Sequence, residues 1–110
     1  MVLISHRGNL EGPNLNHENT RDYIDDAIEE DYEVEIDVWS IDGRLWLGHD
    51  LPTYEVKYDW LLDRRSWLWI HCKNFKALSD LSTSPLITFY HSKEDYTLLS
   101  NGMIWAHNIN

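Results

Sequence analysis

The sequence predicts an α/β fold built from parallel βα units, and two patterns support this. Short apolar or strictly alternating runs recur along the chain, and turn-forming or helix-like segments separate them. Strands that alternate with helices through short connections typically form parallel βαβ units. The 110 residues are enough for one domain, which we assign to residues 1–110.

The chain opens with an apolar run, residues 2–5, that we expect to form the first strand. Residues 8–16 are rich in Gly, Pro and Asn and predict a loop. Residues 19–31 predict a helix, because apolar residues recur on one face of this segment and Asn19 or Thr20 can cap its start.

Residues 33–40 alternate between apolar and mostly acidic side chains, which indicates a second strand. The turn dipeptide Asp42-Gly43 and a second extended run, residues 44–48, then predict a hairpin. For the rest of the chain we expect strands at residues 67–72, 85–90 and 103–106 and helices at 58–65, 77–81 and 94–100.

Five of the six histidines lie at or just beyond the carboxyl ends of predicted strands: His6, His49, His71, His91 and His107. In parallel α/β folds these ends gather at one rim, where active sites lie. A single strand-end histidine is more often a hydrogen-bonded rim residue than a catalyst. The grouping of five histidines at one rim therefore favours a functional site more than any single histidine does.

Glu35 and Asp37 share one face of the second strand, and Lys73 shares a face of the third strand with His71. Two buried carboxylates at this spacing repel each other unless a cation lies between them, and oxygen ligands favour Mg²⁺ or Ca²⁺. The plainer interpretation is that the acidic residues form the solvated face of an edge strand.

The composition excludes several classes of function. With 19 acidic residues against 9 Lys and Arg, the net charge of −10 argues against nucleic acid and against an anionic membrane surface as partners. One cysteine excludes an internal disulfide, and no apolar stretch is long enough to span a bilayer. We therefore expect a cytoplasmic protein without a transmembrane segment.

Five ordered blocks resemble the glycerophosphodiester phosphodiesterase family: His6-Arg7-Gly8, Glu18-Asn19-Thr20, Glu35-Ile36-Asp37-Val38, Asp42-Gly43 and His49-Asp50. The resemblance covers residues 2–50 and continues more weakly to residue 74. It implies a TIM-type (β/α)₈ barrel of the phospholipase-C-like phosphodiesterase superfamily. Since such a barrel takes about 250 residues, this chain would form an incomplete one of about five strands.

The resemblance also implies a role for each site residue. His6 and His49 would be the acid–base pair, and Arg7 and Lys73 would contact the phosphate. Glu35 and Asp37 would bind the divalent cation, Mg²⁺ or Ca²⁺, with Glu18 and Asn19 supporting the site. His71 stands where the family has a glutamate that ligates the metal, so His71 would be a third metal ligand, and a neutral imidazole there suits softer ions.

The expected function is metal-dependent hydrolysis of a small phosphodiester of glycerol or a related polyol. One alternative is a non-catalytic partial barrel that keeps a metal-binding or head-group-binding rim. Another is a binding module that stacks sugars or lipid head groups on its tryptophans, Trp39, Trp46, Trp60, Trp67, Trp69 and Trp105. We also expect self-association, or a missing C-terminal half, to complete the barrel.

Overall fold

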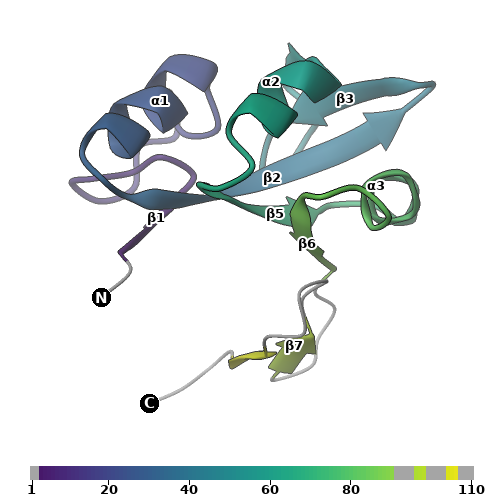
Figure 1. Ribbon diagram of the computed structural model, residues 1–110. Helices are drawn as coiled ribbons and strands as arrows, with labels where there is room; N and C mark the ends of the chain where they lie inside the picture. Colours follow the sequence, from purple (N-terminus) through teal and green to yellow (C-terminus); the bar gives the residue numbers. More distant parts are fainter. Residues whose placement is uncertain (1–2, 91–95, 99–103, 107–110) are drawn as a thin grey trace.

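The computed structural model describes residues 3–90, 96–98 and 104–106, and it describes side chains for residues 3–90. Its elements are shown in Figure 1. In chain order they are β1 (Ile4–His6), α1 (Arg21–Glu29), β2 (Glu33–Ile41), β3 (Arg44–Leu47), β4 (Tyr54–Val56), α2 (Tyr58–Asp63), β5 (Leu68–Cys72), α3 (Phe75–Leu81), β6 (Ile87–Phe89), β7 (Tyr96–Leu98) and β8 (Ile104–Ala106).

A mixed six-stranded sheet organises the fold. Its order is β4-β3-β2-β5-β6, and β1 pairs with β2 beside this path. The pairs β1–β2, β2–β5 and β5–β6 are parallel, whereas β2–β3 and β3–β4 are antiparallel. β7 and β8 form a separate antiparallel pair. The long strand β2 is therefore the common partner of three others.

One edge of β2 is divided between two strands. β1 pairs with its first residues, up to His6 opposite Glu35, and β3 pairs with its last residues, from Val38 opposite Leu47. Two backbone hydrogen bonds close the junction: Arg7 donates to the Glu35 carbonyl at 2.7 Å and Gly48 donates to the Asp37 carbonyl at 3.2 Å. The carboxyl ends of β1 and β3 consequently meet at the middle of β2.

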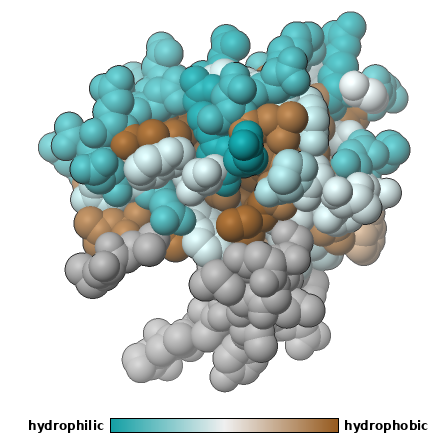
Figure 2. Space-filling model, viewed as in Figure 1, coloured by the Kyte–Doolittle hydropathy of each residue, from teal (hydrophilic) through white to brown (hydrophobic). Residues whose placement is uncertain are grey.

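The apolar face of the sheet packs against the helices. Figure 1 shows α1 and α2 lying over the sheet on this side. In Figure 2 hydrophilic side chains cover the upper part of the same view, where these helices lie, and hydrophobic ones show between and below them. The central residues of this core are fully or almost fully buried: Val34, Ile36, Val38, Leu68, Ile70 and Cys72 from the strands and Ile24, Ala27, Leu61, Ala77 and Leu81 from the helices.

The opposite face of the sheet carries the polar residues. Because side chains alternate along a strand, Glu35 and Asp37 point away from the helices. Their register partners on β5 are Trp69 and His71. Trp69 packs with Phe89 of β6 in a smaller buried cluster. One face of β2 therefore packs in the main core, and the other face carries Glu35 and Asp37.

The predicted fold class is wrong. We expected parallel βα units of an incomplete TIM-type barrel. The predicted hairpin is present as the antiparallel pair β2–β3, but β4 adds a second antiparallel pairing that was not expected. β3 also lies along the same edge of β2 as β1, so the strands do not follow one another as successive parallel units. The described part of the chain contains three helices of 6 to 9 residues, all of them shorter than the mean helix of about 11–12 residues.

Individual elements also differ from the prediction. β4 was not expected. Helix α3 begins at Phe75 rather than at residue 77, because the Asn74 side chain accepts a hydrogen bond from the Ala77 N–H at 3.0 Å and caps the helix. Residues 96–98, expected in a helix, form β7. The other residues of that expected helix lie outside the described residues, as do His91 and His107.

Across the described residues, no helix has the length and apolar character that a membrane crossing demands.

Candidate active site

Two residues in the left-handed backbone region shape the site. Arg7, directly after β1, has φ 59°, and Asn19, just before α1, has φ 63°. The Asn19 N–H donates to the Arg7 carbonyl at 2.9 Å, so the two ends of the intervening loop are tied together. Such conformations are uncommon outside glycine and cluster at functional sites.

Asp37 lies at the centre of the site and is 1% exposed. Its Oδ2 accepts a hydrogen bond from Asn19 Nδ2 at 3.0 Å and forms an ion pair with Arg7 Nε at 3.0 Å. His71 Nδ1 lies 3.1 Å from Oδ1, and His49 Nδ1 lies 3.6 Å from Oδ2. The structure thus brings together residues from β2, β5 and the segments after β1 and β3.

These contacts keep Asp37 ionised. Burial alone would raise the pKa of Asp37, but hydrogen bonds from His71 and Asn19 and the charge of Arg7 outweigh burial and lower the pKa to about 2. A buried charge is tolerated only when it is paired and hydrogen-bonded, and Asp37 meets both conditions.

Arg7 connects Asp37 to Glu18 and His49. Its Nη1 pairs with Glu18 Oε1 at 3.1 Å, and its Nη2 lies 3.3 Å from His49 Nε2. Asn9 Nδ2 donates to the second oxygen of Glu18 at 3.1 Å. The guanidinium is therefore held by two carboxylates, and one of its nitrogens faces the ring of His49.

Glu35 and His6 form a further pair beside the cluster around Asp37 and Arg7. His6 Nε2 lies 3.9 Å from Glu35 Oε1, and the imidazole is 55% exposed. Burial and the nearby charge of Asp37 raise the pKa of Glu35 to about 7. Burial and the charge of Arg7 lower the pKa of His6 below its ordinary value. His6 is accordingly neutral near pH 7 and able to accept a proton.

His71 lies on β5, and Lys73 directly follows this strand. The Lys73 N–H donates to the Val38 carbonyl at 2.8 Å, and its charge acts on the Glu35 carboxyl to lower that pKa. His71 stacks on Phe89 at 5.0 Å between ring centroids and turns its Nδ1 to Asp37. Among the predicted site residues, these two extend the cluster across β5.

The donor set suits one kind of cation site. Within residues 3–90, no group of three or more His, Cys, Asp and Glu side chains could hold a metal ion by itself. Mg²⁺, however, is commonly bound by one or two carboxylates together with substrate phosphate and water. Glu35 and Asp37 fit this pattern, because the charge of Asp37 helps to raise the pKa of Glu35 and a bound cation would lower that pKa again.

A pocket of about 230 Å³ adjoins His49. Its walls come from the loop after β1, the loop after β3 and the start of β4. The lining residues are Leu15, Glu18, Asn19, Gly48, His49, Asp50, Leu51, Thr53 and Tyr54. The pocket therefore opens beside the imidazole to which the family resemblance gives an acid–base role.

Two supporting residues were not expected. Asn9 orients Glu18, and Gly48 lets the chain turn sharply into His49: a Cβ on Gly48 would lie 1.9 Å from the Leu51 carbonyl oxygen. Gly48 directly precedes the histidine block, so its position was a usable signal. The loop around Asn9 carries no comparable pattern.

Three of the tryptophans are engaged within the fold. Trp39 Nε1 donates to the Gly48 carbonyl at 2.7 Å, and Trp69 Nε1 donates to Glu33 at 2.8 Å. The guanidinium carbon of Arg64 lies 4.1 Å from the centre of the Trp60 ring. These contacts support packing roles for the three rings rather than a stacking platform for sugars.

No protein-family model, no curated protein and no solved structure matches this chain.

Proposed function

We propose that this protein is a phosphodiester hydrolase, acting on diesters of glycerol or a related polyol, in which His6 and His49 are the general acid–base pair. One observation supports this most directly. Arg7, from the end of β1, and His49, from the end of β3, lie 3.3 Å apart at the buried carboxylate of Asp37. Histidine, arginine and carboxylate groups in one cluster supply the proton transfer and the charge neutralisation that this reaction needs.

His6 is the base of the first step in this proposal. Its lowered pKa leaves the ring neutral near pH 7, and at 55% exposure the ring is open to a substrate hydroxyl. His6 takes the proton from the attacking hydroxyl, and that oxygen forms its bond to phosphorus. Glu35, 3.9 Å from His6 Nε2, then faces the imidazolium that results.

His49 is the acid of the first step. For this role Nε2 must carry a proton, so the contact of Arg7 Nη2 with His49 Nε2 at 3.3 Å must give way to a contact of Arg7 with the phosphate. His49 then gives that proton to the leaving alkoxide oxygen as the bond from that oxygen to phosphorus breaks. In the resembled family the attacker is a neighbouring hydroxyl of the substrate, so a cyclic phosphate forms first. Water then opens this product, with the two histidines exchanging roles.

Positive charge at the phosphate comes from Arg7 and Lys73. Both lie close enough to Glu35 to lower its pKa, so both act at the same carboxylate face. A divalent cation bound by Glu35 and Asp37 would supply further charge stabilisation as a Lewis acid. Arg7 also holds its charge in place through Glu18 and Asp37, which lowers the cost of reorganisation during the reaction.

The test is hydrolysis of bis(p-nitrophenyl) phosphate and of glycerophosphocholine by the purified chain. We expect His6→Ala and His49→Ala each to lower kcat by about 10²-fold or more. His17→Ala is the matched control, because His17 is exposed and contacts Asn14 outside the cluster. Full activity in both site variants, or equal loss in the control, would refute the assignment.

Binding without turnover is the second candidate function. It is favoured by the engagement of the Arg7 guanidinium with Glu18 and Asp37, which leaves fewer of its donors for a phosphate. A wild-type chain that binds the diester but cleaves none of it with Mg²⁺ or Ca²⁺ present would establish this function in place of hydrolysis.

A further inference from the structure

We propose that the substrate is a nucleoside phosphodiester whose base stacks on an aromatic platform formed by Phe75 and Tyr90. This inference rests on the proposed function and names the substrate class within it. The ribose of a nucleoside is a polyol, and its 2′-hydroxyl lies next to a phosphate on the 3′-oxygen. The substrate therefore carries the attacking hydroxyl of the first step itself.

The aromatic platform consists of two stacked rings from different parts of the chain. Phe75 is the third residue after β5, and Tyr90 directly follows β6. Their ring centroids lie 4.7 Å apart, with 22° between the ring planes. Phe75 is nevertheless 72% exposed, so much of its ring remains open to a ligand. Such a surface suits a nucleobase, because every base has a π-face that stacks on an aromatic ring.

Lys73 connects the aromatic platform to the candidate site. Lys73 directly follows β5, its N–H donates to the Val38 carbonyl, and its charge acts on Glu35. Phe75 follows Lys73 by two residues, a span of at most about 7 Å along the chain. One ligand can therefore hold its phosphate at Lys73 and its base on Phe75.

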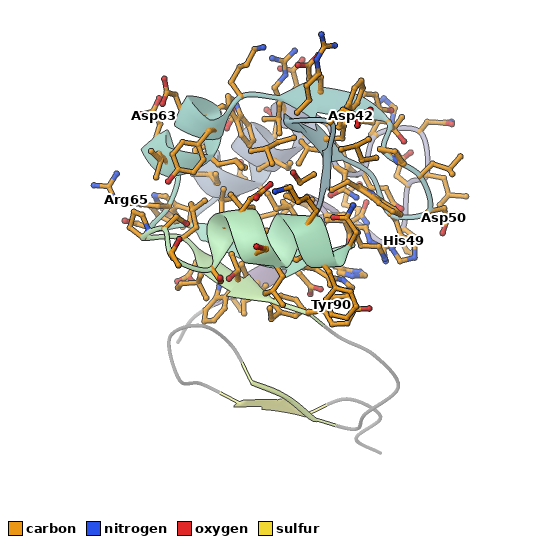
Figure 3. The ribbon with its side chains drawn as sticks, turned by 90° about the vertical axis from the view of Figure 1, so that its right-hand side faces the viewer. Asp42, His49, Asp50, Asp63, Arg65 and Tyr90 are labelled. Carbon is orange, nitrogen blue, oxygen red and sulfur yellow. The ribbon has the colours of Figure 1, made fainter. Side chains whose placement is uncertain are left out.

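Tyr90 lies at the same end of the sheet as the candidate site. The last residue of β6 pairs in parallel with His71 of β5, so Tyr90 lies one residue beyond that level. Figure 3 shows Tyr90 and His49 toward one side of the molecule, with Asp63 and Arg65 at the opposite side. A substrate at the candidate site can therefore extend toward the aromatic platform.

The charge around the aromatic platform favours a base that is joined to a phosphate. Phe75 lies between Lys73 and Lys76 in the sequence. Two ammonium groups disfavour a cation on the ring and favour a ligand that carries a negative charge. The net charge of −10 over the whole chain, in contrast, disfavours a long polyanion. A short diester with one negative charge meets both conditions.

The polar side chains next to Phe75 are engaged within the protein. Asn74 donates to the Ser40 carbonyl at 3.0 Å and accepts from the Ser40 N–H at 3.2 Å. Asn74 also caps α3, and Lys76 donates to Asp80 at 2.9 Å. A sugar without a base needs several free donors and acceptors around it. A nucleobase binds through its π-face, so it suits this surface better.

The ribose supplies the nucleophile of the first step. Its 2′-hydroxyl gives its proton to His6, and the 2′-oxygen forms its bond to phosphorus. The bond from phosphorus to the leaving oxygen breaks, and His49 gives its proton to that oxygen. The products are a nucleoside 2′,3′-cyclic phosphate and a free alcohol. A 2′-deoxy diester lacks the attacking hydroxyl, so we expect it to bind but not to be cleaved.

The first experiment measures binding of adenosine 3′-monophosphate and of glycerol 3-phosphate to the full chain by NMR titration in EDTA. Both ligands carry a phosphate monoester, and only the nucleotide has a base. We expect the nucleotide to bind more tightly, and Phe75→Leu to weaken its binding about fivefold without changing that of glycerol 3-phosphate. Because Phe75 is exposed, this variant should fold as the wild type does.

Tyr58→Leu is the matched control for the ring. Tyr58 is 39% exposed and directly follows Lys57, so it is also an exposed ring beside a lysine. It lies two residues after β4, and β4 and β6 are at opposite ends of the strand order. Equal affinity for the two ligands, or an equal loss of nucleotide binding in the control, overturns the inference.

The second experiment separates this inference from the proposed function. It compares kcat/KM for the dinucleoside phosphate ApA, its 2′-deoxy analogue and glycerophosphocholine in the wild type and in Phe75→Leu. We expect the wild type to prefer ApA, the variant to lose about fivefold of that preference, and the 2′-deoxy analogue to stay intact.

The two proposals fail in different ways. If the nucleotide binds at Phe75 but no diester is cleaved, the proposed hydrolysis fails and the aromatic platform stands. If glycerophosphocholine is cleaved and Phe75→Leu changes the kcat/KM of neither diester, the aromatic platform fails and the proposed function stands. Equal cleavage of ApA and its 2′-deoxy analogue would overturn attack by the ribose hydroxyl.

Discussion

Asn19 holds Asp37 by two hydrogen bonds that run in opposite directions. The Asn19 amide nitrogen donates to Asp37 Oδ2 at 3.0 Å, and the Asp37 backbone N–H donates to the Asn19 side-chain oxygen at 3.0 Å. Asn19 is 1% exposed and adopts φ 63°. A residue outside the sheet thereby fixes both the backbone and the carboxylate of the central strand.

Replacement of Asn19 should destabilise the fold. Two different variants should separate the loss of its hydrogen bonds from backbone strain at its positive φ. Asn19→Gly removes both hydrogen bonds but tolerates the positive φ, so we expect a loss of about 2 kcal/mol or more in the free energy of unfolding. Asn19→Ala adds about 1 kcal/mol of backbone strain. Urea unfolding of both variants measures the difference. Asn16→Ala, at an exposed loop position, should change stability little, and an equal loss there would contradict the assignment.

Gly48→Ala should displace His49. The added Cβ would lie 1.9 Å from the Leu51 carbonyl oxygen and 2.8 Å from Thr53 Oγ1, so the backbone of the loop must shift. We expect a loss of about 2 kcal/mol in unfolding free energy, together with a fall in kcat as the imidazole moves. Gly43→Ala is the matched control: Gly43 also has a positive φ, of 77°, but nothing lies within 4 Å of its added Cβ. A control as inactive as Gly48→Ala would show that steric displacement is not the cause.

Stability should fall with rising pH through the titration of Glu35. Its pKa is raised from 4.5 to about 7 in the folded chain, so the folded state binds more protons than the unfolded state between these values. The stability that this proton contributes is present below pH 4.5 and is lost as the pH rises through 7, up to about 3 kcal/mol. His6 acts in the opposite sense, because its pKa is lowered in the folded state.

The quantity to compare is therefore the difference between the wild type and Glu35→Gln, measured by urea unfolding at pH 5 and pH 7.5 in EDTA. We expect the variant to gain stability relative to the wild type at the higher pH. Asp37 does not interfere, since its pKa of about 2 places its titration below this window. Parallel pH profiles of the two proteins would show that Glu35 titrates as it does in the unfolded chain.

A divalent cation should stabilise the folded chain. In the proposed site Mg²⁺ would bind only the folded state, in which Glu35 and Asp37 lie close together, so millimolar Mg²⁺ should raise the melting temperature by mass action. Glu35→Gln should abolish this rise. Glu29→Gln, at an exposed position at the end of α1, should retain it. A rise of equal size in Glu35→Gln would place the cation elsewhere on this acidic surface.

Much of the sheet could be predicted because its strands carry their own signal. Residues 33–40 alternate between apolar and mostly acidic side chains, and residues 67–72 form an apolar run, so both strands of the centre were expected nearly at their observed bounds. β4 escaped prediction because it has only three residues and owes its existence to pairing with β3. Residues 96–98, Tyr-Thr-Leu, have strand propensity and form β7, whereas we predicted a helix over residues 94–100.

The sequence could predict which candidate residues lie close together, but not the contacts that join them. Strand position and the family resemblance both singled out His6, Glu35, Asp37 and His49, which the structure places in one cluster. The ion pairs of Arg7 and the turn of His71 toward Asp37 depend on contacts between elements far apart in sequence. Periodicity and composition contain no information on such contacts. The fold class failed for a different reason: the predicted hairpin was placed within a series of parallel βα units, and the second antiparallel pairing, between β3 and β4, was not expected.

The divided edge of β2 has a consequence for the order of folding. β3 follows β2 after a two-residue turn, so this hairpin closes with little loss of chain entropy. β1 must return across a loop and a helix before it can pair with the other half of the edge. We therefore expect the hairpin to form early and β1 to dock late. Chains that have formed only the hairpin hold His49 without His6 or Arg7, so during refolding the proposed activity should return with the slowest phase rather than with the first gain of secondary structure.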